Sequence, residues 1–329
     1  MAAQIVENEE PQLPQILIHR LPSFDLPFKA QLVTRFRLID PYASSDPTAF
    51  FSSPQAQSVR VLLPVGPSPV TADTLRCLPS LQCVIGSSAG VDHIDLAECR
   101  RRGIAVTNAG SAFSEDVADY AVGLLIDVLR RLSAADRYVR SGSWPVKGEY
   151  PLGSKLGGKR VGIVGLGSIG YEIAKRLEAF GCSIAYNSRK KKPSVLFPFH
   201  ENVCSLAANS DVLIICCALT NETHHLINKD VMTALGKEGV IINIGRGALI
   251  NEKEMVQFLV QGEIKGAGLD VFENEPNVPK ELFELDNVVL SPHRAVLTPE
   301  SFTTLYEVVM ANLDAFFSNK PLVSPVDLE

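Results

Sequence analysis

Short apolar runs alternate with helical stretches along the first third of the chain. The runs lie at residues 15–20, 59–65, 81–86 and 104–107. A helical pattern at residues 92–102 separates the last two runs. Strands that alternate with helices imply a parallel sheet covered on both faces. The pattern therefore predicts an α/β domain here, preceded by a disordered lead-in at residues 1–14.

A long helix and a second alternating series are predicted next. Residues 114–139 have the periodicity of one helix, and residues 141–158 form a Gly-, Ser- and Pro-rich loop around Trp144, the single tryptophan. Six further apolar runs lie at Arg160–Val164, 183–186, 211–217, 240–244, 266–270 and Val288–Leu290. Six parallel strands with crossover helices predict a doubly wound sheet. A last helix is predicted at Pro299–Phe317.

Length and charge narrow the function classes. A chain of 329 residues suggests two domains. Its 31 basic and 37 acidic side chains give a net charge of −6, which argues against a nucleic-acid partner. No apolar stretch reaches the roughly 18 residues of a membrane span. The first residues lack the pattern of a signal or transit peptide, and the seven cysteines form no CxxC pair, so we expect a cytoplasmic protein with reduced thiols.

The strongest motif is a glycine-rich turn between a strand and a helix. In KRVGIVGLGSIGYEIAKRL, residues 159–177, the glycines form GxGxxG. This context is the one that a dinucleotide-binding turn requires, because its glycines allow a tight turn, close approach of a pyrophosphate and helix packing. The helix N-terminus then offers N–H groups to the anion. We assign the cofactor contacts to Gly165, Leu166, Gly167, Ser168, Ile169 and Gly170.

The end of the second strand indicates which nicotinamide cofactor is bound. An acidic residue there would bind the ribose 2′-hydroxyl and repel a 2′-phosphate. The chain instead has Asn187, Ser188 and Arg189, followed by three lysines that begin at Lys190. Amide, hydroxyl and guanidinium groups suit a phosphate. The alternative is a solvated charge run in a loop. We expect NADP(H) to be preferred, with NAD(H) possible.

A cation, a carboxylate and an imidazole follow three successive predicted strands. Arg246, with its planar fork, can hold a substrate carboxylate and carbonyl oxygen. His293 can give a proton to that oxygen, and Glu275 can orient the imidazole and favour its charged form. These groups are what reduction of a 2-keto acid needs, and no metal site is predicted. Singly, each has a plain alternative: a helix cap for Arg246, a turn residue for Glu275, a structural histidine for His293.

At these residues the chain resembles the D-isomer-specific 2-hydroxyacid dehydrogenase family. The segments GLGSIG, NIGRGALI, GLDVFENEP and SPH occur in that family's order and spacing, and the match runs from about residue 15 to 325. The pieces GVDHIDL, EDVADYAVGLL, LRR and NSRKKK place it nearest to plant-type hydroxypyruvate and glyoxylate reductases, some of which also reduce hydroxyphenylpyruvate. That resemblance also implies a part in photorespiration.

The resemblance implies a fold and an assembly. It implies two doubly wound domains with a cleft between them. A flavodoxin-like substrate domain is built from residues 1–105 and 299–329, and a Rossmann cofactor domain from residues 106–298. It further implies a homodimer joined through the long helix near residues 115–140. In some relatives a loop tryptophan of the partner reaches the active site, and Trp144 stands at the matching place; a plain surface or interface anchor is the alternative.

Further site residues are implied by the same resemblance. Arg246, Glu275 and His293 match the catalytic set, and Arg246 and His293 also border the cofactor. The substrate carboxylate would meet backbone N–H groups at Ser88, Ala89 and Gly90, where the alternative is a plain strand-to-helix turn. Contacts to the cofactor would come from Leu219, Thr220, Thr223, Ile244, Gly245 and Asp270. For Asp270 the alternative is a buried acid that holds the strand end.

Two departures from the family pattern stand out. Relatives usually have small residues after the catalytic histidine, whereas here Ala295 and Val296 follow Arg294. We expect these bulkier side chains to crowd the space beside the nicotinamide or the substrate. Ala218 stands where relatives often have proline, with little expected effect.

The sequence predicts an NADPH-preferring reductase that converts hydroxypyruvate to D-glycerate and glyoxylate to glycolate. One alternative is a bulkier 2-keto acid such as hydroxyphenylpyruvate, or phosphoglycerate with NAD. An alternative of another class is a cofactor-sensing, corepressor-like binding protein. That alternative does not explain why all three catalytic groups are present.

Overall fold

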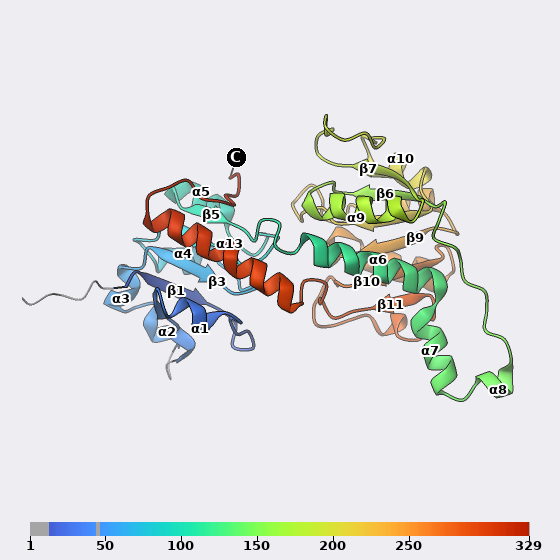
Figure 1. The fold of residues 1–329 in the computed structure, drawn as a ribbon, viewed down its shortest axis with the longest axis horizontal. Helices are drawn as coiled ribbons and strands as arrows, with labels where there is room; N and C mark the ends of the chain where they lie inside the picture. The colour runs from blue at the N-terminus through green and yellow to red at the C-terminus, as the bar shows by residue number, and fades with distance from the viewer. Residues whose placement is uncertain (1–12, 44–46, 329) are drawn as a thin grey trace, which may run out of the picture. The chain divides into compact units, whose positions relative to one another are not determined.

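The computed structural model describes residues 13–43 and 47–328, and its chain divides into two units (Figure 1). The first unit contains Met1–Ala112 and Pro299–Glu329, and the second contains Phe113–Thr298. The boundary expected after residue 105 is too early, because the strand β5 (Ala105–Thr107) pairs within the first sheet. The predicted disordered lead-in lies almost entirely outside the described residues.

The first unit is built on a five-stranded parallel sheet. Its strands are β1 (Gln15–His19), β2 (Arg37–Ile39), β3 (Val61–Pro64), β4 (Cys83–Ile85) and β5. The order β2-β1-β3-β4-β5 is that of flavodoxin-like sheets. Four of these strands, β1, β3, β4 and β5, lie within the predicted apolar runs. The strand β2 was not predicted, because a three-residue edge strand with only one buried residue leaves almost no hydrophobic pattern.

Helices cover both faces of this sheet. They are α1 (Lys29–Leu32), α2 (Pro47–Phe50), α3 (Pro54–Gln57), α4 (Ala72–Arg76), α5 (Leu96–Arg102), α13 (Pro299–Phe317) and the 3₁₀ turn η1 (Pro41–Ala43). The last helix, α13, returns to pack on β4. In Figure 1 it crosses the front of the sheet, on the face opposite α4 and α5.

The second unit is built on a six-stranded parallel sheet. Its strands are β6 (Arg160–Val164), β7 (Ser183–Asn187), β8 (Val212–Ile215), β9 (Val240–Asn243), β10 (Gly266–Leu269) and β11 (Val288–Leu290). They stand in the order β11-β10-β9-β8-β6-β7. A single parallel bridge from Tyr186 to Phe199 continues the sheet beyond β7. If the bridged segment at Phe199 is counted as the third strand along the chain, after β6 and β7, the strand order is that of a Rossmann dinucleotide-binding sheet. The predicted class, two doubly wound α/β domains, is confirmed.

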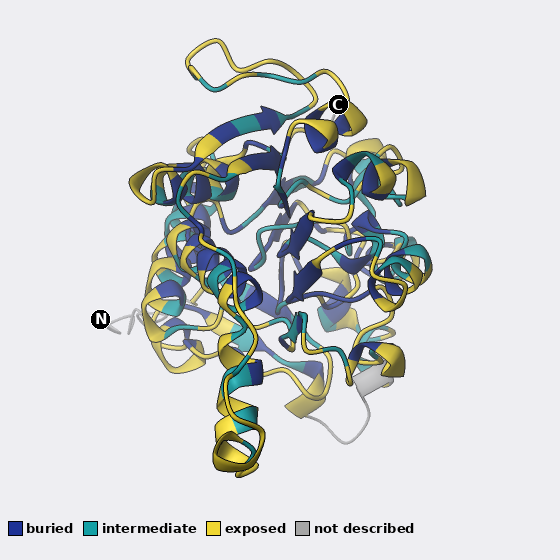
Figure 2. Ribbon diagram, turned by 90° about the vertical axis from the view of Figure 1, so that its right-hand side faces the viewer, coloured by how far each residue is buried: buried dark blue, intermediate teal, exposed yellow. Residues whose placement is uncertain are grey.

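Two layers of helices enclose this second sheet. The helices and 3₁₀ turns of the unit are α6 (Ser114–Arg130), α7 (Leu132–Arg140), α8 (Trp144–Lys147), α9 (Ser168–Ala179), α10 (Val203–Ala208), α11 (Lys229–Leu235), η2 (Gly247–Leu249), α12 (Glu252–Val260) and η3 (Lys280–Leu282). α6 and α9 pack together on one face, whereas α10, α11 and α12 share a buried core with the other face. The central strands β8, β9 and β10 are buried throughout, whereas the edge strands β7 and β11 are partly buried (Figure 2).

The single helix predicted over residues 114–139 is two helices. The break falls at Arg131, which has a left-handed backbone with a φ of 55° and ends α6. The Asp127 carboxylate then accepts the backbone N–H of Ser133 at 2.8 Å and starts α7 on a new axis. The chain continues into the short helix α8 within the predicted loop, so α7 and α8 form an arm that projects from the unit (Figure 1).

The remaining sequence expectations concern thiols and membranes. All seven cysteines are free, and burial raises the pKa of Cys83 to about 12 and those of Cys99 and Cys217 to about 11. Among the described helices, none has the length and apolarity needed to span a bilayer.

Candidate active site

Arg246 stands on the loop that follows β9, at the carboxyl end of the sheet. The loop is shaped by Asn243, the last residue of β9, which is 1% exposed. The Asn243 amide donates to the Arg246 carbonyl at 2.9 Å, and its oxygen accepts the Gly245 N–H at 3.1 Å. A buried amide that bonds both sides of the turn fixes the backbone from which Arg246 projects. The guanidinium donates to the Gly245 carbonyl at 2.8 Å.

The next residue, Gly247, lies directly against the loop that follows β10. A Cβ atom there would collide with the backbone of Phe272 and Glu273. Only glycine permits this approach. The loop that carries Arg246 and the loop that carries Glu275 are therefore in backbone contact.

Glu275 and His293 form a hydrogen-bonded pair. The atoms Nδ1 of His293 and Oε2 of Glu275 lie 2.8 Å apart, and the other carboxylate oxygen accepts the Phe272 N–H at 3.1 Å. Burial alone would raise the pKa of Glu275. The hydrogen bond and charge of His293, the Phe272 N–H and the charge of Arg246 outweigh burial and hold that pKa below its usual value. Glu275 is therefore ionised at neutral pH, and its carboxylate interacts electrostatically with both His293 and Arg246.

Asp270, at the end of β10, holds the loop on which His293 stands. Its buried carboxylate accepts the Ser291 hydroxyl at 2.6 Å and the N–H groups of Arg294 and Ala295 at 2.8 and 3.0 Å. Its carbonyl accepts the His293 N–H at 2.8 Å. These bonds hold His293 at a φ of 53°, a conformation that residues with a side chain rarely adopt. A cofactor contact by Asp270 stays a prediction.

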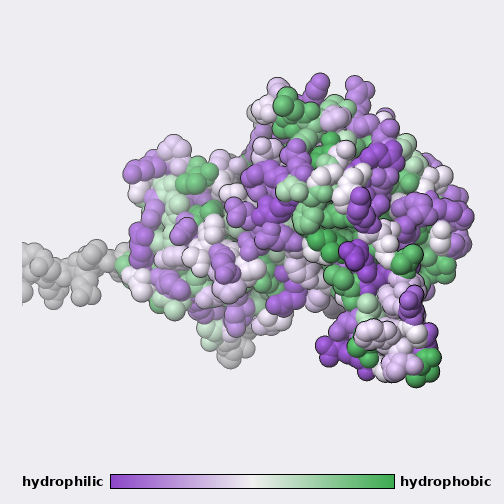
Figure 3. All heavy atoms as spheres, turned by 45° about the vertical axis from the view of Figure 1, so that its right-hand side comes forward, coloured by the Kyte–Doolittle hydropathy of each residue, from purple (hydrophilic) through white to green (hydrophobic). Residues whose placement is uncertain are grey.

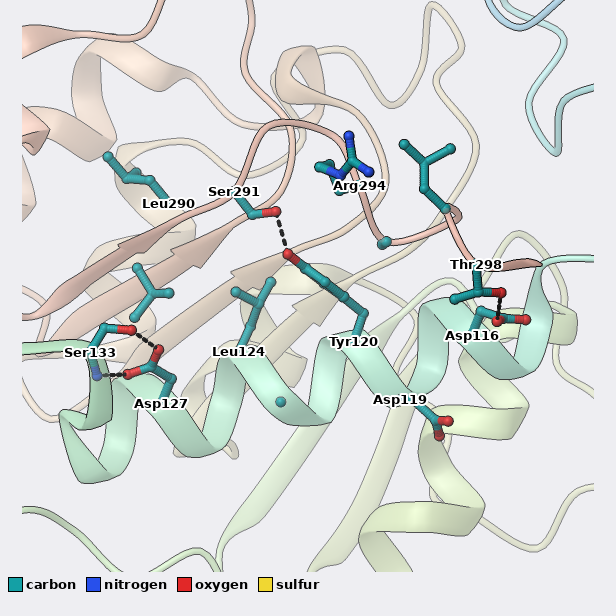
Figure 4. Close-up of a pocket in the computed structure, with 14 residues that line it drawn as sticks. Asp116, Asp119, Tyr120, Leu124, Asp127, Ser133, Leu290, Ser291, Arg294 and Thr298 are labelled. Atoms are coloured by element: carbon teal, nitrogen blue, oxygen red, sulfur yellow. Dashed lines mark hydrogen bonds between the residues drawn. The ribbon is translucent and has the colours of Figure 1, made fainter. Parts of the chain in front are cut away.

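A cavity of about 600 Å³ lies between α6 and the loop after β11 (Figure 4). Tyr120 of α6 and Ser291 bond through their hydroxyls at 2.5 Å, and Thr298 donates to Asp116. Ala295 also lines this cavity. The three predicted catalytic residues do not line this cavity. The cavity lies beside the loop that carries His293 and does not contain the catalytic groups.

The glycine-rich turn between β6 and α9 has the shape that a dinucleotide requires. Gly165 has a φ of 100°, and a Cβ there would meet the Cys217 backbone at 2.6 Å. Gly167 is the N-cap of α9, so no side chain caps the first turn, and the space where its Cβ would stand is open. Uncapped N–H groups above an open glycine can receive a pyrophosphate. The residues present therefore fit a dinucleotide cofactor.

The buried side chain of Tyr186 fixes the backbone of the segment after β7 by a hydrogen bond. This fully buried tyrosine accepts the Lys192 N–H at 2.8 Å, and Asn187 donates to the His200 carbonyl at 2.9 Å. The Ser188 hydroxyl donates to the Lys190 carbonyl at 2.7 Å. Among these described residues the side chains of Arg189 and Lys190 are exposed. A cationic edge thus stands one strand from the glycine-rich turn.

Two other segments predicted to contact the cofactor also follow strands of this sheet. Thr223 closes the loop after β8: its hydroxyl donates to the Ala218 carbonyl at 2.8 Å and accepts the Thr220 N–H at 2.7 Å. Leu219 packs on the core of the unit, and Ile244 is buried. Their contacts to a cofactor stay predictions.

The predicted substrate loop belongs to the first unit. Ser88, Ala89 and Gly90 follow β4 and are partly buried. Ser88 is fixed because its carbonyl accepts the Ala109 N–H at 2.9 Å. Within the described residues, the N–H groups of Ala89 and Gly90 donate no hydrogen bond. A loop with two available N–H groups suits a carboxylate. Trp144 lies on the α7–α8 arm of the second unit and is 61% exposed.

Comparison with known proteins decides the family. The model of the D-isomer specific 2-hydroxyacid dehydrogenase NAD-binding domain matches residues 122–295. A glyoxylate/hydroxypyruvate reductase of Arabidopsis thaliana, HPR3, is 59% identical over 99% of this chain and 100% of its own. The chain belongs to the D-isomer specific 2-hydroxyacid dehydrogenase family. The resemblance noted from the sequence is confirmed.

Other members of this dehydrogenase family are similar over most of their length. A hydroxyphenylpyruvate reductase of Plectranthus scutellarioides is 46% identical over 90% of this chain and 94% of its own. The crystal structure of an NADPH-dependent glyoxylate/hydroxypyruvate reductase from Sinorhizobium meliloti, in complex with NADP and malonate, superposes with a TM-score of 0.87. That protein is 37% identical, and the match covers 96% of this chain and 97% of the other.

In this dehydrogenase the structure unites Arg246, Glu275 and His293 at one sheet edge, and their catalytic roles stay predictions. The role of Asn243 in shaping the arginine loop was not predicted from the sequence. A polar residue at the end of an otherwise apolar strand was the signal that could have identified it. The support of Ser291 by Tyr120 of α6 was not predicted either, because nothing in the local pattern shows a contact so distant in sequence.

We expect Asp270→Asn to lower both thermal stability and turnover. The amide nitrogen would face a backbone N–H that the carboxylate now accepts, at a cost of about 1–3 kcal/mol for an unsatisfied buried group. Differential scanning fluorimetry and NADPH oxidation kinetics measure the two effects. Asp286→Asn removes an exposed acid that pairs with Arg137 and should change neither. Equal behaviour of the two variants would contradict the support role of Asp270.

Proposed function

We propose that this dehydrogenase is an NADPH-preferring reductase of small 2-keto acids. Hydroxypyruvate would give D-glycerate, and glyoxylate would give glycolate. The observation that carries the proposal is the hydrogen-bonded Glu275–His293 pair, with the Arg246 charge acting on the same carboxylate. The similarity to glyoxylate/hydroxypyruvate reductases over nearly the full chain supports this substrate class.

His293 supplies the proton in this proposal. Its Nδ1 is engaged by Glu275, so Nε2 is the nitrogen that can face a substrate oxygen. The ionised carboxylate fixes the tautomer and the orientation of the ring, as an orienting acid does for a catalytic histidine. The hydrogen bonds from Arg294 and Ala295 to Asp270 fix the backbone beside His293, so little conformational entropy is lost when the ring is oriented for catalysis.

Arg246 binds and polarises the substrate. A guanidinium can hold a carboxylate and the neighbouring carbonyl oxygen together, and it stabilises the negative charge that forms on that oxygen during reduction. The cofactor would be held by Gly165–Gly170, by Asn187 and Ser188, and by the exposed side chains of Arg189 and Lys190. When bound, reduced NADP supplies the hydride. The protein's own contribution is to orient the substrate and deliver the proton to its oxygen.

The preference for NADPH over NADH follows from the edge beside β7. Two exposed cations, Arg189 and Lys190, occupy the place where an acid would select a ribose hydroxyl. An exposed guanidinium can pair with a phosphate through two hydrogen bonds.

We also infer a homodimer in the cytosol. The α7–α8 arm exposes apolar side chains at its end, where Figure 3 shows hydrophobic groups among polar ones. Trp144 is 61%, Val146 83% and Leu152 95% exposed. An exposed apolar cluster on a projecting element is typical of an interaction site. A second copy would cover this arm, and Trp144 would then lie at the interface.

The proposed function predicts a defined substrate ranking. We expect NADPH oxidation to be fast with hydroxypyruvate and glyoxylate, and slower with pyruvate and 4-hydroxyphenylpyruvate. Absorbance loss measured for the four acids side by side checks this order, with NADH in parallel. A kcat/KM highest for 4-hydroxyphenylpyruvate would replace the proposed substrate class with bulky keto acids. No turnover with any of them would favour a binding protein.

Replacement of the proton donor separates chemistry from binding. His293→Ala should lower kcat by about 10²–10⁴-fold, the usual contribution of a general acid. NADPH affinity, measured by fluorescence titration, should stay within a few fold. His200→Ala, which removes a histidine bonded to Ser205, serves as the matched control and should keep full turnover. Near-normal turnover of His293→Ala would exclude the acid role.

The cationic edge gives a third expectation. The double variant R189A/K190A should raise the KM for NADPH by about tenfold or more and leave the KM for NADH nearly unchanged, because only NADPH carries the 2′-phosphate. The double variant K191A/K192A removes the same charge from the same run and should have a smaller effect. Equal changes for both cofactors would refute a phosphate contact at Arg189 and Lys190.

A further inference from the structure

Two histidines and a carboxylate come together beside the catalytic loops, outside the proposed machinery. His224 and His225 lie on the loop between β8 and α11, and Glu273 lies on the loop after β10. One ligand atom from each residue lies within 4.8 Å of the other two. His225 Nε2 and Glu273 Oε1 are 2.7 Å apart, and the two imidazoles stack with their centroids 3.9 Å apart. No metal site was predicted from the sequence, where His224 and His225 are visible only as two adjacent histidines.

We propose that His224, His225 and Glu273 bind a divalent transition-metal ion of the zinc class. Two imidazole nitrogens and one carboxylate oxygen form a ligand set that Zn²⁺ accepts, with water in the fourth position. Hard ions such as Mg²⁺ prefer oxygen ligands, so the two histidines select against them. A surface ion pair between His225 and Glu273 alone would not need the second imidazole.

The backbone beneath each ligand is already fixed. The N–H of His225 donates to the Ala248 carbonyl at 2.8 Å, and that of His224 donates to the Thr220 carbonyl at 3.0 Å. The N–H of Glu273 donates to Glu252 Oε2 at 3.0 Å. Binding would therefore cost little backbone entropy, because the loops are held before the ion arrives.

The side chains themselves can adjust to an ion. His225 and Glu273 have about a third of their side-chain surface exposed, and His224 is exposed. In a tetrahedral site with bonds of about 2.0–2.1 Å, two ligand atoms stand about 3.3 Å apart. The His225 nitrogen and the Glu273 oxygen must therefore separate by several tenths of an ångström from their present 2.7 Å. Exposed side chains achieve such a shift by rotation about χ.

The position of this cluster connects three strand-end loops. Its ligands come from the loops after β8 and β10, which flank β9 in the sheet. The carbonyl that anchors His225 belongs to Ala248, two residues after Arg246, and Glu273 precedes Glu275 by two residues. An ion here would bridge the loops on both sides of the arginine loop and stiffen them.

Zinc titration of the full chain tests this site. The protein must carry no polyhistidine tag and be freed of metal with a chelator before calorimetry at pH 7.5. We expect one Zn²⁺ per chain, a rise in Tm with Zn²⁺ and none with Mg²⁺. Loss of one ligand in His224→Ala or Glu273→Gln should weaken Zn²⁺ binding by more than about tenfold, since even the loss of a supporting group has that effect. Glu273→Gln keeps the size of the side chain.

The control and a spectroscopic readout make the outcome decisive. His200→Ala, which removes a partly buried histidine bonded to Ser205, should bind Zn²⁺ as the unaltered protein does. Co²⁺ should give visible d–d absorption in the unaltered protein and in His200→Ala, but not in His224→Ala. An unaltered protein without Zn²⁺ binding, or equal affinity in all four proteins, would overturn the proposal and leave only a His225–Glu273 ion pair.

Discussion

The contact between the Gly247 backbone and the Phe272 backbone is the constraint on which the candidate site depends. Parallel strands bring their carboxyl ends to one edge, but the loops that leave β9 and β10 would diverge without a further contact. Because Gly247 has no side chain, the two loops meet backbone to backbone. The charge of Arg246 therefore acts on Glu275, which in turn bonds His293. Any side chain at Gly247 would separate the cation from the carboxylate.

Buried polar groups then convert this contact into a fixed geometry. Asn243 is the last residue of β9 and Asp270 directly follows β10, and each is 1% exposed. Neither side chain has to leave the core, because each satisfies backbone groups of the loop that follows its own strand or the next one. An amide or a carboxylate buried in this way is costly unless all its bonds are made. That requirement gives the loops one conformation, including the left-handed backbone at His293.

The class of fold and the residues at the strand ends could be predicted from the sequence because both signals are local. Buried parallel strands are apolar throughout, and the candidate site residues directly follow those apolar runs. β2 was missed because three edge residues with one buried side chain leave no pattern. The break at Arg131 was missed because its cause is a cap from Asp127 rather than a glycine or proline. Two hydrogen bonds could not be predicted, because they join residues far apart in sequence and depend on the folded sheet. They are the bond between Tyr120 and Ser291 and the bond between His225 and Glu273.

The charges of the chain show how local the relevant electrostatics are. The net charge is −6, yet the edge beside β7 carries Arg189 and three lysines in succession. At physiological ionic strength exposed charges are screened beyond about 8 Å, so an anion at this edge responds to these cations and hardly to the distant acids. One acid does reach it. A hydrogen bond from Thr220 chiefly lowers the pKa of Glu222, and the Arg189 charge adds to that effect. Glu222 thus stays ionised beside Arg189 and moderates the positive field. A doubly charged phosphate interacts more strongly with the remaining positive field than a neutral hydroxyl does.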